Sequence, residues 1–141
     1  MATTTANLFQ NAKSYAAAAD RLLEANALDD SLAPAFYLLI GHSLELSIKA
    51  LCLKAGATEK DLKKFGKWGH DLHEAYIWAM NKHKVPTYFT PLGQLILALN
   101  DHHKKGSFRF TPNVPKLVVP PPDYCVRILN EHIAAVESQL K

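Results

Sequence analysis

Cysteine is scarce in this sequence, and its scarcity excludes several kinds of protein. The 141 residues contain only two cysteines, Cys52 and Cys125. Two cysteines are too few for a disulfide framework or for a zinc site built from paired thiolates. Each lies in an apolar helical pattern, where a free thiol packs as a small hydrophobic side chain. This cysteine usage fits a reducing compartment, and we expect a cytoplasmic protein.

Other marks of membrane proteins and enzymes are also missing. The first ten residues have neither a basic nor an apolar region, so we expect no signal peptide. Every apolar run long enough to cross a bilayer contains His, Glu or Lys, so we expect no membrane association. There is no glycine-rich phosphate loop and no serine or cysteine in the context of a catalytic triad, and we expect no cofactor. His70 and His73 have the i, i+3 spacing of zinc ligands, but no further ligand completes a set, so no metal is expected.

The overall composition is that of a single globular domain. Hydrophobic residues make up 48% of the chain and charged residues 21%, both close to the averages for globular proteins. A chain of this length can bury one core, so we expect one domain over residues 1–141. The net charge of +3 gives a mild preference for anionic partners.

The stretch Ala35–Ala55 predicts a long central helix. Apolar residues recur along it at steps of three and four, and most of its remaining positions are apolar too. A helix that is apolar nearly all round is usually buried. Its polar residues lie on narrow lines, of which one holds His42, Glu45 and Lys49. Either Glu45 and Lys49 form an ordinary i, i+4 pair beside His42, or the three form a buried polar line that positions a partner or ligand.

Similar periodicity predicts four more helices, joined by short connections. The expected helices run from Ala6 to about Ala27, from His70 to the turn at 85–90, from Thr90 to Gly106 and from Tyr124 to Leu140. Residues 1–5 are expected to be a loose tail, and Thr58–Gly69 to hold one short helical turn. Short connections make consecutive helices antiparallel neighbours. The predicted fold is therefore an all-α, antiparallel up-down bundle of about five helices.

A proline-rich segment, GSFRFTPNVPKLVVPPP, separates the last two of these helices. It spans residues 106–122 and holds five of the chain's eight prolines. Proline removes a helical hydrogen bond, so this segment is predicted to be an extended strap.

Three motifs in order resemble the HEPN domain family over most of the chain, roughly Ala6–Leu140. They are GHSLELSIKALCLKAG in the central helix, GHDLHEA at the next helix, and ALNDHHKKGSFRFTP after the fourth. In the last motif, His103 stands at an aromatic position and Arg109 begins RFTP in place of Arg-Tyr-Pro. The resemblance implies a small helical bundle, often dimeric, with functions around nucleotides or RNA. Some members are metal-independent ribonucleases of toxin–antitoxin and defence systems, which use an Arg, four to six residues and then a His; others bind nucleotides or partners.

Two groups of residues are candidates for such catalysis. Arg127 and His132 match the ribonuclease spacing, but a five-residue step turns a helix by about 140°. Arg127 is thus expected to face water while His132 borders the apolar face. The second group, Asn100, His102, His103 and Arg109, has residue types suited to proton transfer and phosphate binding. Its order is reversed, and these histidines could instead complement the end of a helix or pack against the core.

We expect basic residues to gather at one end of the bundle, where the central helix ends, the third begins and the fourth ends. Such an end either attracts phosphates or is simply a solvated surface. Its expected members are Lys54, Lys60, Lys63, Lys64, Lys67, His70, His102, His103, Lys104, Lys105 and Arg109.

Three functions follow as alternatives. The first is a HEPN-like module that binds a nucleotide, RNA or a partner protein, such as a nucleotidyltransferase encoded beside it; we expect it to be a homodimer without efficient catalysis. The second is an active HEPN ribonuclease, and the third is a structural adaptor bundle. The residues expected to bind a ligand are His42, Glu45, Lys49, Lys63, Lys64, His70, Asp71, Asn100, His102, His103 and Arg109.

Overall fold

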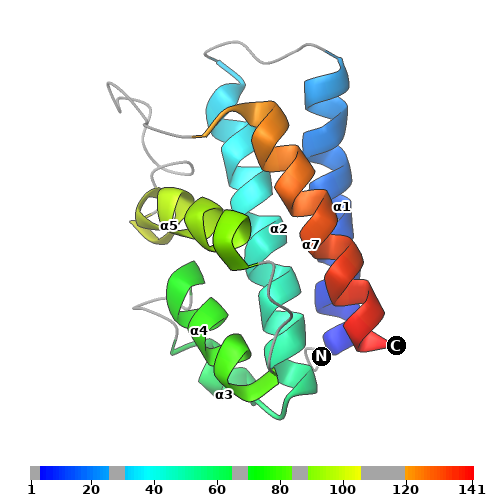
Figure 1. Ribbon diagram of the computed structural model, residues 1–141, viewed down its shortest axis with the longest axis vertical. Coiled ribbons are helices and arrows are strands. Elements are labelled where there is room, and N and C mark those ends of the chain that lie inside the picture. The colour runs from blue at the N-terminus through cyan, green and yellow to red at the C-terminus, as the bar shows by residue number, and fades with distance from the viewer. Residues whose placement is uncertain (1–3, 26–30, 65–69, 84–88, 106–119) are drawn as a thin grey trace.

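The computed structural model describes residues 4–25, 31–64, 70–83, 89–105 and 120–141. Within these ranges it contains helices and no strand, which confirms the predicted all-α class (Figure 1). The helices are α1 (Thr5–Glu24), α2 (Ala33–Lys54), α3 (Glu59–Leu62), α4 (Leu72–His83), α5 (Phe89–Lys105) and α7 (Pro122–Leu140).

Helix α2 is the centre of the fold. It contacts every other helix of the described chain. Ile40, Leu44 and Ile48 on its inner side are almost completely buried. By length and mean hydropathy, α2 is also the one described helix that could cross a membrane, yet 67% of its apolar window is buried within the fold. This burial is expected of a core helix, and it explains why α2 is apolar nearly all round.

Helices α1 and α7 lie along α2, whereas α5 lies across the long axis (Figure 1). The Tyr37 hydroxyl near the start of α2 donates to the Pro120 carbonyl, just before α7, at 2.6 Å. Lys54 at the end of α2 donates to the carbonyl of Leu140, at the end of α7, at 3.4 Å. Because α2 and α7 contact each other near their starts and again at their ends, α7 runs parallel to α2. The all-helical class therefore holds, but the up-down arrangement of five alternating helices is not confirmed.

Local capping explains where the helices begin and end. The Thr4 hydroxyl accepts from the Asn7 amide at 3.0 Å, so α1 starts at Thr5, inside the segment expected to be a loose tail. Gly56 ends α2 with a φ of 106°, a left-handed conformation that glycine adopts without strain. Thr58 and Asp61 form a reciprocal capping box that holds the short helix α3.

The predicted strap is described only at its end. Residues 106–119 lie outside the described residues, and Pro120 and Pro121 are non-helical as predicted. Helix α7 begins at Pro122, two residues before the predicted start, because a proline fits the first turn of a helix.

Candidate functional site

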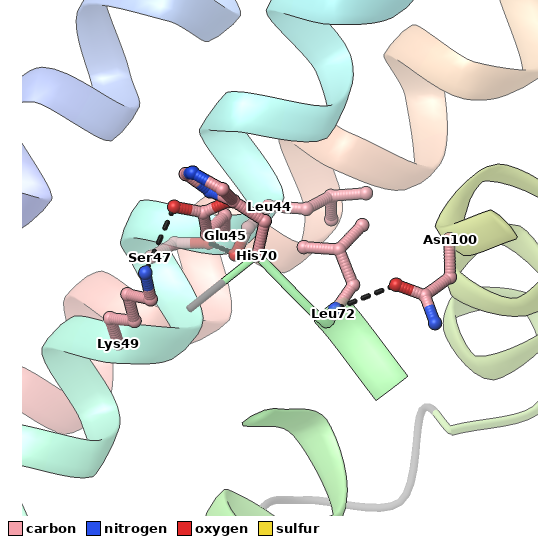
Figure 2. A network of polar contacts seen from close by, with 7 residues as sticks. All are labelled: Leu44, Glu45, Ser47, Lys49, His70, Leu72 and Asn100. Carbon is pink, nitrogen blue, oxygen red and sulfur yellow. Dashed lines mark hydrogen bonds and ion pairs between the residues drawn. The ribbon is translucent and has the colours of Figure 1, made fainter. Parts of the chain in front are cut away.

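A buried carboxylate on α2 organises the polar residues of this fold. Glu45 is only 4% exposed, and both of its oxygens are engaged (Figure 2). Oε2 accepts from the Lys49 ammonium at 3.0 Å, and Oε1 lies 2.9 Å from Nδ1 of His70. A carboxylate can only accept, so His70 carries its proton on Nδ1 in this contact. We call Glu45, Lys49 and His70 the Glu45 cluster.

Burial gives the Glu45 cluster its chemical character. A buried carboxylate needs opposite charge and hydrogen bonds to offset its lost hydration; Lys49 supplies the charge and a hydrogen bond, and His70 supplies a second hydrogen bond. The side chain of Lys49 is 12% exposed and that of His70 is 28% exposed, so the cluster reaches the surface mainly through the imidazole. The expected i, i+4 pair is therefore present, and it also forms part of a buried polar line.

Two further rings, those of Tyr15 and His42, lie next to the His70 ring of this cluster. The rings of Tyr15 on α1 and His42 on α2 have centroids 5.5 Å apart. The His42 and His70 rings follow at 6.5 Å in an edge-to-face arrangement. The predicted residues His42, Glu45, Lys49 and His70 are thus brought together, and Tyr15 joins them from a helix whose sequence did not indicate it as a site residue.

Asp71 and Asn100 hold the start of α4 against α5. The Asn100 side chain is buried, and its Oδ1 accepts from the backbone amide of Leu72 at 2.7 Å (Figure 2). Its Nδ2 donates to Oδ1 of Asp71 at 3.0 Å, and the same carboxylate oxygen accepts from the Glu74 amide. Asp71 follows His70 in the chain and Asn100 contacts the next two residues, but these contacts give both residues a structural role, Asp71 as a helix cap and Asn100 as its support.

The candidate pair Arg127 and His132 does not form one site. Arg127 is exposed, and its guanidinium lies 5.5 Å from the centroid of the Tyr124 ring. His132 is 2% exposed and lies 2.9 Å from the Ser47 hydroxyl, through Nε2. The sequence placed His132 at the border of the apolar face; the structure corrects this, because the residue lies within the core between α7 and α2. Burial lowers the pKa of His132 to about 4.

The predicted basic end is only partly assembled. The start of α4 meets α5 near its end, as expected, but His70 lies beside the middle of α2 rather than its end. Lys54 reaches α7 instead. This differs from the expectation because α4 starts beside Glu45, in the middle of α2, and then runs toward the end of α2, where the Cys52 thiol contacts the Ala75 carbonyl; periodicity alone does not reveal this placement.

Other members of that end have fewer described features. Lys63 and Lys64 are exposed just after α3. His102, His103, Lys104 and Lys105 belong to the last turns of α5, but their side chains lie outside the described part of the structure. Lys67 and Arg109 lie wholly outside it.

Two cavities lie away from the Glu45 cluster in the part of the chain that the structure describes. A mostly apolar cavity of about 330 Å³ lies between α5 and the start of α7. A second cavity, of about 540 Å³, lies where α1 begins and α2 and α7 end. Among the side chains that the structure describes, no three of His, Cys, Asp or Glu converge as metal ligands.

Comparison with known proteins gives no assignment for these residues. Neither the models of known protein families, nor the curated proteins, nor the solved structures contain a match to the chain. A function is therefore inferred from the geometry and chemistry of the described residues.

Proposed function

We propose that this chain is a HEPN-like helical module that binds a nucleotide, RNA or a partner protein and does not cleave RNA efficiently. The separation of Arg127 and His132 is the observation that supports the lack of efficient RNA cleavage. A general acid or base must come within hydrogen-bond reach of the proton that it transfers. His132 is enclosed in the core and bonded to Ser47, while Arg127 lies on the surface against Tyr124. A phosphate held by Arg127 is therefore out of reach of His132.

The Glu45 cluster and the exposed lysines support the binding half of the proposal. The rings of Tyr15, His42 and His70 present flat surfaces on which a base can stack. Lys63 and Lys64 are exposed cations that can attract phosphates.

A cytoplasmic homodimer is part of the same proposal, and a nucleotidyltransferase is the partner class that the resemblance implies. The physical support for self-association is one face of α2 that its neighbours leave half open. At 3.6 residues per turn, five of the half-buried positions of this helix fall on a single stripe, which we call the open stripe. Its members are Leu39, His42, Leu46, Lys49 and Leu53.

Salt-dependent binding tests this proposal. Affinity for single-stranded RNA or a nucleotide should fall as salt rises, because basic groups that contact phosphate release counterions. Replacing Lys63, Lys64 and Arg109 together by Ala should weaken binding about tenfold or more without lowering the melting temperature. Arg127→Ala serves as the matched control, since it also removes an exposed cation but should leave affinity nearly unchanged. Salt-independent binding, or none, would favour the structural adaptor.

A cleavage assay with a chelator present tests the absence of catalysis. We expect no RNA cleavage above the background of the Arg127→Ala variant. His132→Ala is a poor probe, because it empties a core position and lowers stability. Metal-independent cleavage that disappears in Arg127→Ala would restore the ribonuclease.

A further inference from the structure

The cavity of about 540 Å³ lies where three helix ends meet, and we call it the helix-end cavity. The beginning of α1 and the ends of α2 and α7 lie at the same end of the molecule (Figure 1). Lys13 on α1 lies 3.8 Å from Glu137 on α7, and Lys54 on α2 donates to the Leu140 carbonyl. These contacts tie the three helices together around the opening. Its lining residues are Thr5, Ala6, Phe9, Gln10, Lys13, Lys54, Glu137, Leu140 and Lys141.

Positive charge predominates in this lining. Its side chains include three lysines and one carboxylate, so their formal charge is 3 − 1 = +2. The carboxylate of Glu137 already faces Lys13. Lys54 donates to a carbonyl at 3.4 Å, a long hydrogen bond to a group that carries no net charge. An anion in the cavity would meet Lys54 and Lys141, and the first turn of α1 adds the positive end of a helix dipole.

The floor of the cavity is apolar. Ala6, Phe9 and Leu140 contribute it, and Lys13 lies over the Phe9 ring at 5.2 Å from the centroid. Because Lys13 covers one face of the Phe9 ring, stacking of a flat base on that ring is disfavoured. A flexible aliphatic chain can instead lie along the apolar residues of the lining. The volume lies within the range of small-molecule sites, about 300–1,000 Å³.

We propose that the helix-end cavity binds a small amphipathic anion, with one anionic head group held by Lys54 and Lys141 and an aliphatic body against Phe9 and Leu140. The lysines also neutralise the carbonyl ends of α2 and α7, so part of their charge is already used and the affinity should be modest. This site is separate from the Glu45 cluster and from Lys63 and Lys64. The proposal for the helix-end cavity can therefore be tested independently of RNA or nucleotide binding.

Three probes that differ in one property each test the proposal on the full chain. Octanoate has the head and the body, octylammonium has the body with the opposite charge, and inorganic phosphate has only the charge. By calorimetry and amide chemical shifts, octanoate should bind about tenfold more tightly than either of the others. The shifts should centre on Ala6, Phe9 and Leu140. Octylammonium or phosphate binding as tightly as octanoate would overturn the proposal, and so would no binding of octanoate.

Charge-neutral variants test the assigned head-group site. Replacing both lysines, as Lys54→Gln with Lys141→Gln, should lower octanoate affinity about tenfold, because two cations are lost at exposed positions while glutamine can still donate to the Leu140 carbonyl. Arg21→Gln with Lys60→Gln removes the same charge from exposed positions elsewhere and should change affinity by less than about twofold. Equal losses in the two double variants would show attraction by net charge alone and would overturn the assignment.

Discussion

At the scale of single residues, the pair Ser47 and His132 defines the chemistry of the core. The Ser47 hydroxyl donates to the Leu44 carbonyl at 3.0 Å, so its oxygen accepts from Nε2 of His132. His132 thus carries a proton on Nε2, and its burial favours the neutral form of the ring. Protonating its second nitrogen would place a positive charge in the apolar contact between α2 and α7. This explains the direction in which burial moves the pKa.

The buried imidazole makes stability depend on pH. Its pKa is about 4 in the folded chain, against 6.5 for an unperturbed histidine. Since the unfolded chain binds the proton more readily, the contribution of His132 is fully present above pH 6.5 and is lost as pH falls toward 4. The difference between these two pKa values corresponds to roughly 3 kcal/mol. Urea unfolding between pH 8 and pH 4.5 should show this decline.

His132→Gln separates this effect from other titrations. Glutamine keeps an N–H donor for Ser47 but does not titrate, so the variant should lose less stability on acidification than the wild type. It should also be somewhat less stable at pH 8, because the core is repacked. Parallel pH profiles for the two proteins would rule out His132 as the titrating group.

At the scale of elements, Asn100 joins α5 to the first turn of α4. Asn100→Ala leaves the Leu72 amide without its acceptor in a buried place and opens a small cavity, so we expect a loss of about 1–3 kcal/mol. Hydrogen exchange at the Leu72 amide should accelerate along with it. Asn130→Ala, at an exposed position on α7, is the matched control and should change stability by less than about 0.5 kcal/mol. Equal effects of the two substitutions would contradict the structural task of Asn100.

Helix existence was predictable here, whereas the polar contacts between helices were only partly so. The apolar periodicity of Ala35–Ala55, Gly56 and Asp71 with Glu74 are local signals, and the observed α2, its end and the start of α4 follow them. The Glu45–Lys49 pair was equally local. The partner of His132 was not, because Ser47 lies 85 residues away and helical spacing does not tell at which level two helices meet. For the same reason Lys54 was expected beside α4 and lies beside α7.

At the scale of the whole molecule, the open stripe of α2 predicts self-association. Light scattering should give twice the chain mass of 15.7 kDa. Leu46→Arg should shift the protein toward the single-chain mass, because it replaces the central leucine of the open stripe by a long charged side chain. Leu97→Arg is the control, since Leu97 is 59% exposed on α5. A single-chain mass for the wild type throughout the micromolar range would count against the dimer.

The docking of α7 also has a consequence for the order of folding. The contact of α1 with α2 through Ala12 and Ser43 spans 31 residues, whereas those of α7 with α2 through His132 and Leu140 span 85 and 86. Closing the longer loop loses more chain entropy, so we expect α1 and α2 to pair before α7 arrives. During synthesis α7 leaves the ribosome after the other described helices. Until then the nascent chain exposes an apolar side of α2, the kind of surface that chaperones bind.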